Sequence, residues 1–270
     1  MDFKNYLVPG KTGLLIGIGG VSMSPLAEVL HDAGLDIRGS DMAESSNTLT
    51  LRERGIPIHI GHSADNVTDD ISFVIRTAAV HDDNPEVHEA HRRGIPVFER
   101  TQAWGALMRG YQNALCISGT HGKTTTTSMC THIMMAAEKD PTVMIGGTLP
   151  LLKACHRVGK GNTIIMESCE YYNSFLALNP TIAVVLNIEA DHLDFFKDLE
   201  DIKHSFRCFA ERVPAETGTV IANYDDANTM DALRGIARKV ITFGLNAKAD
   251  VYAQNIVHRG SVSEFDIYHR

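Results

Sequence analysis

The sequence contains little of what marks a secreted, membrane-spanning or nucleic-acid-binding protein. Its five cysteines are scattered and form no C-x-x-C pair, which favours reduced cytosolic thiols over disulfides or zinc. No apolar run approaches the roughly 20 residues that cross a bilayer, and the first residues lack the apolar core of a signal peptide. Acidic residues outnumber basic ones by 33 to 25, so we expect no nucleic-acid partner. The composition therefore predicts a cytoplasmic protein without membrane insertion.

The length of 270 residues suggests about two domains. Short apolar segments alternate with helical ones along the chain, and this alternation predicts an α/β protein with parallel sheets and crossover helices. We expect a Rossmann-like parallel-sheet domain at 1–107 and a P-loop type α/β domain at 108–270. The strands expected in the first domain are 13–20, 36–41, 57–60, 72–77 and 95–98.

The segment Gly17 to Ser22 resembles the opening of a Rossmann-type βαβ unit. The G-x-G-x-x-G fingerprint is only partly met, because Ser22 replaces the third glycine. Asp41 ends the next strand, about 20 residues beyond the first glycine, where ribose hydroxyls are usually held. A nicotinamide cofactor, a nucleotide-sugar and a structural turn all remain open. The predicted ligand residues, at the carboxyl ends of strands, are Gly17, Gly19, Gly20, Ser22, Asp41, Thr77, Ala78 and Ala79.

A second glycine loop joins an expected strand at 113–118 to an expected helix at 124–137, whose apolar positions include Met129 and Ile133. Glycines let backbone amides approach phosphate oxygens, the helix start adds positive potential and a lysine adds charge. The spacing departs from G-x-x-x-x-G-K-[ST] at Ile117. We nevertheless expect an ATP site, in which His121 either touches phosphate or shapes the loop. The predicted phosphate ligands are Gly119, Thr120, His121, Gly122, Lys123, Thr124 and Thr125.

Carboxylates and an imidazole follow two later strands, expected at 162–167 and 181–187. If these strands are adjacent in the sheet, their ends form a metal site that faces the phosphates. Mg²⁺ prefers hard oxygen ligands, so Glu170 with one imidazole is an acceptable partial shell. Glu167 is an alternative ligand or supports Lys123 or a water, and His192 is either a ligand or a hydrogen-bonded capping residue.

The rest of the second domain continues the alternation. An amphipathic helix is expected at 199–213, and strands are expected at 220–223, 240–244 and 249–255. The last residues, 264–270, have the pattern of the first arm of a hairpin.

Five ordered motifs, taken together, resemble the Mur ligases of bacterial cell-wall synthesis. They are residues 17–24 (GIGGVSMS), 39–41 (GSD), 82–86 (DDNPE), 119–125 (GTHGKTT) and 187–194 (NIEADHLD). The family has three domains, which hold the UDP-sugar, bind ATP, and close over both ligands. The resemblance covers the first domain and most of the second, and the third is expected to be missing from this chain.

The resemblance implies an ATP-dependent ligase. ATP phosphorylates the lactyl carboxylate of UDP-N-acetylmuramate, and the amino group of L-alanine attacks the acyl phosphate. By motif position, Lys123, Glu170 and His192 are catalytic, and Thr124, Glu170 and His192 hold Mg²⁺. Residues 167–172 (ESCEYY) depart from the EADESD of many relatives, which leaves the outer metal shell open.

The resemblance and the residues together leave several functional alternatives. Without the closing domain, we expect this chain to bind its ligands but not to turn over. A sibling ligase that adds a peptide to the same sugar, an NAD-dependent dehydrogenase built on residues 12–105, and a non-catalytic UDP-sugar-binding module are the alternatives.

Overall fold

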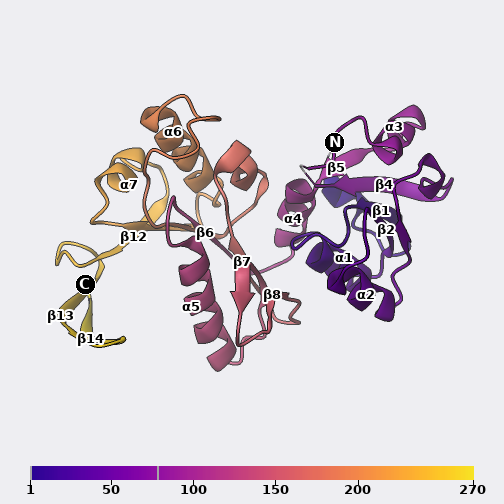
Figure 1. Cartoon of the computed structure of the whole chain (residues 1–270). Helices are drawn as coiled ribbons and strands as arrows, with labels where there is room; N and C mark the ends of the chain where they lie inside the picture. The colour runs from indigo at the N-terminus through magenta and orange to yellow at the C-terminus, as the bar shows by residue number, and fades with distance from the viewer. Residues whose placement is uncertain (1, 78) are drawn as a thin grey trace. The chain divides into compact units, whose positions relative to one another are not determined.

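The computed structural model describes residues 2–77 and 79–270. Contacts divide the chain into two compact units (Figure 1), one formed by 1–110 with 152–159 and the other by 111–151 with 160–270. The sequence analysis placed the domain boundary between residues 107 and 108 and assigned residues 152–159 to the second domain, whereas the contacts group this short segment with the first unit. Among the residues described, no helix is long and apolar enough to cross a membrane.

The first unit is built on a five-stranded parallel sheet in the order β3-β2-β1-β4-β5. This confirms the parallel sheet predicted from the alternation. Its strands are β1 (Thr12–Ile16), β2 (Asp36–Asp41), β3 (Ile58–Ile60), β4 (Ile71–Arg76) and β5 (Val97–Glu99). Its helices are α1 (Ser24–Asp32), α2 (Ser46–Glu53), α3 (Pro85–Arg92) and α4 (Arg100–Met108), with 3-10 turns η1 (Phe3–Tyr6) and η2 (Ala64–Asn66).

The core of the first unit lies around its central strand, β1, whose five residues are all buried. Leu14 and Ile16 of this strand pack with Val74 of β4 and with Val87 and Ala90 of α3. Burying an aliphatic side chain of this size contributes about 1.5–3 kcal/mol, so this cluster fixes α3 against the sheet. The loops that follow the strands remain at one edge, where such sheets bind ligands.

The second unit carries a mixed sheet in the order β14-β13-β12-β11-β10-β6-β9-β7-β8. Its strands are β6 (Asn113–Ser118), β7 (Thr142–Leu149), β9 (Thr163–Glu167), β10 (Ile182–Val185), β11 (Thr219–Asn223), β12 (Lys239–Gly244), β13 (Val251–Arg259) and β14 (Val262–His269). The edge strand of this sheet, β8 (Ala154–Arg157), belongs to the segment 152–159 that the contacts group with the first unit. Its helices are α5 (Lys123–Ala136), α6 (Leu199–Ala210) and α7 (Ala227–Ala232), with a 3-10 segment η3 (Tyr171–Ala177). Helix α5 packs on β6, β7 and β9, and α6 and α7 pack on each other and on β10 and β11.

The strand order corrects one expectation about the site. The strands at 163–167 and 182–185 are not neighbours, because β6 lies between them and pairs in parallel with both. The phosphate loop follows β6 directly, so segments that follow three neighbouring strands meet at one edge of the sheet. The segments that carry Glu170 and His192 therefore follow the two strands on either side of the strand that leads into the loop.

The end of the chain also differs from the prediction. β13 and β14 form an antiparallel hairpin, shown in yellow in Figure 1. Residues 264–270 thus belong to its second arm and not to its first. The pairing begins with Val251 opposite His269 and ends with Arg259 opposite Val262, with a register shift between Gln254 and Val257. The first arm is therefore the predicted strand at 249–255, extended to Arg259.

Candidate functional site

The phosphate loop turns through two glycines with positive φ, Gly119 (+143°) and Gly122 (+84°). Such backbone angles are strained for residues with a side chain, which explains why the sequence has glycine at both positions. Gly122 is the N-cap of α5, and no side chain caps the helix there. The first amides of a helix have no intrahelical acceptor, so the start of α5 presents donors and positive potential to an anion.

Lys123, the first residue of α5, extends back over this loop. Its Nζ donates to the carbonyl oxygens of Gly119 (2.5 Å) and Thr120 (3.1 Å) and to both carboxylate oxygens of Glu170 (3.1 and 3.3 Å). The side chains of Lys123 and Glu170 are only 14% and 3% exposed. Burying a charge is costly unless it is paired and hydrogen bonded, and here each charge satisfies the other.

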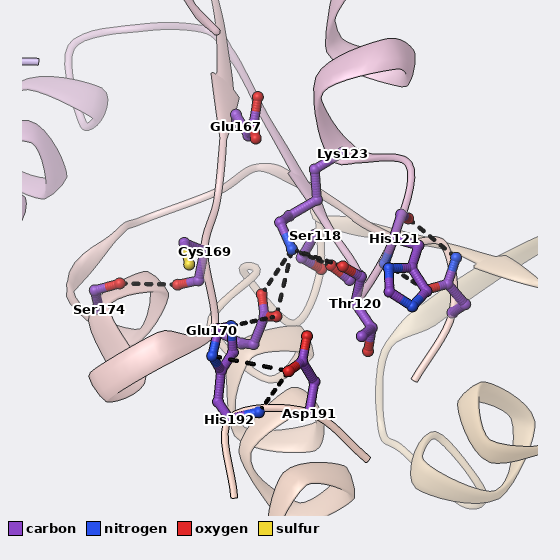
Figure 2. Close-up of polar contacts among 12 residues, drawn as sticks. Ser118, Thr120, His121, Lys123, Glu167, Cys169, Glu170, Ser174, Asp191 and His192 are labelled. Carbon is purple, nitrogen blue, oxygen red and sulfur yellow. Dashed lines mark hydrogen bonds and ion pairs between the residues drawn. The ribbon is translucent and has the colours of Figure 1, made fainter. Parts of the chain in front are cut away.

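Glu170 also lies next to His192, as the sequence predicted. The imidazole Nε2 is 3.8 Å from a Glu170 carboxylate oxygen. Figure 2 shows Lys123 extending toward Glu170 from one side and His192 lying on the other. The three predicted catalytic side chains are thus brought together, although the sequence separates them by up to 69 positions, from Lys123 to His192.

The side chain of Tyr171 holds His192 in place, and Asp194 in turn holds Tyr171. The ring of Tyr171 stacks on the imidazole, with centroids 4.3 Å apart, and its hydroxyl donates to Asp194 at 2.5 Å. This bond to a carboxylate raises the pKa of Tyr171. His192 and Tyr172 both have positive φ (52° and 53°), and such backbone strain is often found where side chains must be aimed at a ligand.

Thr124 contacts Glu167, the residue that the sequence offered as an alternative metal ligand. Its hydroxyl donates to Glu167 at 2.9 Å, and the second Glu167 oxygen accepts the Gly146 N–H at 2.6 Å. A Cβ on Gly146 would lie 2.6 Å from that carboxylate, so any larger residue here would have to displace the Glu167 carboxylate from these bonds. The predicted metal ligands therefore divide into Thr124 beside Glu167 and Glu170 beside His192, with Glu167 drawn apart from the Lys123 group in Figure 2.

The donor chemistry of these two groups suits Mg²⁺. They offer carboxylate and hydroxyl oxygens, which are the hard ligands that this ion prefers, and Mg²⁺ usually completes its shell with water and phosphate. Within residues 2–77 and 79–270, no three His, Cys, Asp or Glu side chains are grouped as a metal site formed by protein alone would require.

His121 points away from Lys123. Its Nε2 lies 3.6 Å from a carboxylate oxygen of Glu189, and both side chains are more than half exposed. Its backbone N–H and carbonyl are both hydrogen bonded to the side chain of Asn187. This geometry favours the second of the two predicted roles, in which His121 shapes the loop.

The glycine loop of the first unit is closed by Asp41. The carboxylate accepts the Gly19 N–H at 2.8 Å, and a Cβ on Gly19 would lie 3.0 Å from it and 2.8 Å from Thr48. Gly17 has φ +77° and is backed by Thr77, whose methyl group would lie 3.5 Å from an added Cβ. Asp41 thus supports the loop, in addition to the ribose role predicted for it.

The remaining residues predicted to bind the UDP-sugar lie around the same loop. The Gly20 N–H donates to the Gly17 carbonyl at 3.1 Å and tightens the turn. Ala79 is exposed after β4, whereas Ala78 lies outside the described residues.

Sequence reasoning missed two residues at this loop, Arg100 and Trp104 of α4. The Arg100 guanidinium hydrogen bonds the Ser22 hydroxyl, and the Trp104 indole N–H donates to the Ser22 carbonyl at 3.3 Å. Arg100 therefore brings a cation to a loop that can receive phosphate. One signal could have found it, because Arg100 directly follows β5 and the carboxyl ends of parallel strands are where ligands bind.

Comparisons with known proteins match two successive parts of the chain. Residues 15–112 match the model of the Mur ligase family catalytic domain, and residues 117–269 match that of the Mur ligase middle domain. A UDP-N-acetylmuramate–L-alanine ligase of Agathobacter rectalis is 47% identical over 243 residues, which are 90% of this chain and 53% of that protein. The chain thus spans about half the length of the curated relatives it matches.

Two solved structures are similar to the fold as a whole. The UDP-N-acetylmuramate–alanine ligase of Thermotoga maritima has a TM-score of 0.77 at 29% identity, over 96% of this chain and 58% of that one. The UDP-N-acetylmuramate:L-alanyl-γ-D-glutamyl-meso-diaminopimelate ligase of Neisseria meningitidis has a TM-score of 0.82 at 24% identity, over 96% and 84%. At that identity the second likeness concerns the fold alone.

Proposed function

The chain belongs to the Mur ligase family, and we propose that it carries the UDP-sugar and ATP sites of an enzyme that joins L-alanine to UDP-N-acetylmuramate. The observation that carries this proposal is the arrangement of Lys123, Glu170 and His192 around the phosphate loop. The 47% identity to a ligase with these substrates supports the choice of L-alanine. ATP would bind in the second unit and the UDP-sugar in the first.

The reaction that we propose proceeds in two steps. A lactyl carboxylate oxygen of UDP-N-acetylmuramate attacks the γ-phosphorus of ATP, which forms an acyl phosphate and releases ADP. The amino group of L-alanine then attacks the acyl carbon, the C–O bond to phosphate breaks, and the amine loses a proton. Inorganic phosphate and an amide are the products. Both steps develop negative charge on phosphoryl oxygens, which catalysis must stabilise.

The residues of this chain would act mainly by electrostatic stabilisation and positioning. Lys123 would neutralise charge on the transferring phosphoryl group, and the first amides of α5 would orient its oxygens. Thr124, Glu170 and His192 would hold Mg²⁺, with Glu167 supporting Thr124. When bound, the metal supplies Lewis-acid polarisation of the phosphate oxygens.

The first unit would bind the UDP-sugar through its glycine loop. The proposed contacts are the turn at Gly17, Gly19 and Gly20, the hydroxyl of Ser22, and the segment 77–79 that follows β4. Arg100 would add a positive charge for the pyrophosphate, because its guanidinium already lies on Ser22. Asp41 would accept a ribose hydroxyl with the oxygen that does not bond Gly19.

The 270 residues are proposed to bind both ligands without ligating at a useful rate, because they span about half the length of their curated relatives. Among the alternatives, a dehydrogenase or a UDP-sugar-binding module leaves the Lys123–Glu170 pair without a role. The other alternative is a sibling ligase that adds a peptide to the same sugar. The likeness to such a ligase concerns the fold alone and does not bear on the choice of substrate.

Calorimetric titration of the 270-residue protein tests the proposal. We expect UDP-N-acetylmuramate to bind, ATP with Mg²⁺ to bind at a separate site, and Lys123→Met to abolish nucleotide binding while sugar binding is kept. The absence of sugar binding, together with binding of NADH, would refute the assignment of the first unit. Robust formation of UDP-muramoyl-alanine by the 270 residues would refute the binding-only proposal.

A further inference from the structure

The side chain of Asn187 holds the phosphate loop from outside it. Its Oδ1 accepts the His121 N–H at 2.8 Å, and its Nδ2 donates to the His121 carbonyl at 3.0 Å. A side-chain amide that engages both polar groups of one residue imitates the pairing of two strands. It therefore fixes the orientation of that part of the loop as well as its position. Asparagine suits this task, because it is neutral and carries a donor and an acceptor on one planar group.

Two more hydrogen bonds connect the same segments. The Asn187 carbonyl accepts the Thr120 N–H at 3.0 Å, and the Thr120 hydroxyl accepts the Glu189 N–H at 2.9 Å. The loop can come this close because residue 119 is glycine. A Cβ at Gly119 would lie 2.9 Å from the Leu186 side chain. The segment directly after β10 thus fixes the conformation of the phosphate loop through backbone and side-chain hydrogen bonds.

These bonds decide which amides remain for a phosphate. The N–H groups of Thr120 and His121 already donate to Asn187, so they cannot donate to a ligand in the same arrangement. The N–H groups at 123–125 have no acceptor within α5, and no side chain caps this helix at Gly122. The donors available to phosphate therefore include the amides in the first turn of the helix but not those of Thr120 and His121.

We propose that Asn187 is a positioning residue for ATP, because by clamping His121 it sets where the amides of 123–125 and the Lys123 ammonium meet the phosphates. The Lys123 ammonium depends on the loop directly, since it donates to the carbonyls of Gly119 and Thr120. The inference rests on the proposed ATP site and adds to it a residue from outside the loop.

The test compares ATP binding in the presence of Mg²⁺ by the 270-residue protein and its Asn187→Ala variant. We expect the Kd for ATP to rise about tenfold in the variant, which corresponds to about 1.4 kcal/mol. Amide hydrogen exchange, followed by NMR, provides a second readout that does not depend on the ligand. The His121 amide should exchange faster in the variant, because its acceptor is removed.

Asn223→Ala is the matched control. Asn223 donates from its Nδ2 to the carbonyl of Leu186 at 3.0 Å, so it supports the same chain segment without bonding the phosphate loop. Its removal should leave the Kd for ATP within about twofold. Asn187→Asp is the second test variant. It keeps the acceptor, loses the donor and places a negative charge near the phosphates, so its Kd should rise more than tenfold. A far-UV circular dichroism spectrum and a urea-unfolding curve that match those of the wild type show that the second unit of each variant is folded.

Wild-type ATP affinity in Asn187→Ala would overturn the proposal. An equal loss of affinity in Asn187→Ala and Asn223→Ala would also overturn it, because it would indicate a general loosening of the strand end. If the wild-type protein binds UDP-N-acetylmuramate but no ATP, the proposed ATP site fails and this inference falls with it. ATP binding by the wild-type protein distinguishes the two failures. If the wild type binds ATP, only the role of Asn187 is refuted; if it does not, the ATP site itself is refuted.

Discussion

The Lys123→Met substitution tests how far the Lys123–Glu170 pair stabilises the second unit. Methionine keeps an unbranched side chain but removes the ammonium group that bonds both Glu170 oxygens. Because the Glu170 side chain is 3% exposed, its carboxylate would then be buried without that cation. Removing one partner of a buried ion pair costs about 3–5 kcal/mol. Lys123 is 14% exposed and His192 lies close to the carboxylate, so we expect a loss of about 2–3 kcal/mol.

A double variant separates the contribution of the charge pair to stability from that of side-chain packing. Lys123→Met combined with Glu170→Gln removes both charges and leaves two neutral groups of similar size. Replacing both members of a buried pair avoids the cost of an uncompensated charge, so the double variant should regain most of the lost stability. The coupling energy in this double-mutant cycle is expected to be about 1–2 kcal/mol.

Urea unfolding can measure the two units separately, because the only tryptophan in the sequence, Trp104, is buried in α4 of the first unit. Its fluorescence follows the first unit, whereas far-UV circular dichroism follows both. In Lys123→Met, the transition seen only by circular dichroism should move to lower urea, and the fluorescence midpoint should stay unchanged.

Three results would contradict this reasoning. The first is a second-unit midpoint that does not move, which would mean that water or another group compensates Glu170. The second is an equal shift of the Trp104 transition, which would indicate an effect on the whole molecule. The third is a double variant as unstable as Lys123→Met alone, which would assign the loss to packing and not to the unpaired charge.

Other contacts lead to three further predictions. Gly146→Ala should destabilise the protein by about 1–3 kcal/mol in urea unfolding, because its Cβ would overlap the Glu167 carboxylate, whereas Gly147→Ala, which makes an ordinary contact at 3.6 Å, should not. Tyr171→Phe removes a hydroxyl bond but keeps the ring, so Mg²⁺·ATP affinity measured by calorimetry should fall about tenfold with an unchanged melting temperature. Burial raises the pKa of Cys116 to about 12, so at pH 8 its thiol stays protonated and should react with Ellman's reagent only after unfolding; reaction in the folded protein would refute this.

The sequence could predict the phosphate loop because its signals are local. Two glycines, a lysine and a helix start within a few residues predict one conformation and one charge. The same locality explains why the helix after the loop was predicted but its buried face was not. Met129 and Ile133 are more than half exposed, whereas Thr127 and Thr131 are buried. Each threonine satisfies its hydroxyl by donating to the carbonyl four residues earlier, so residue polarity alone gave the wrong face.

Pairings between distant segments could not be predicted in the same way. Whether Thr124 bonds Glu167 or Glu170 depends on strand order and on the direction of each side chain at its strand end. The sequence indicated that acids lie near the loop but not that β6 separates the two strands that carry the ligands. Arg100 reaches Ser22 across 78 positions. Its place directly after β5 marks it as a candidate ligand residue, but nothing in the local sequence indicates Ser22 as its partner.

A carboxylate at the end of a parallel strand can support a neighbouring turn or bind a ligand. Both units of this chain contain a carboxylate that supports a turn. Asp41 accepts the amide of Gly19, and Glu167 accepts the amide of Gly146. In both cases a Cβ on the glycine would come within 3.0 Å of the carboxylate. The acid and the glycine thus form one unit that holds a turn closed. An acid that follows a strand indicates ligand binding from sequence alone. Its glycine partner, which lies in the turn after β1 for Gly19 and on β7 for Gly146, reveals a supporting role as well. Glu170 has no such glycine among its hydrogen-bond partners in the described part of the chain, and it bonds Lys123 directly, which makes it the carboxylate best placed to act on a ligand.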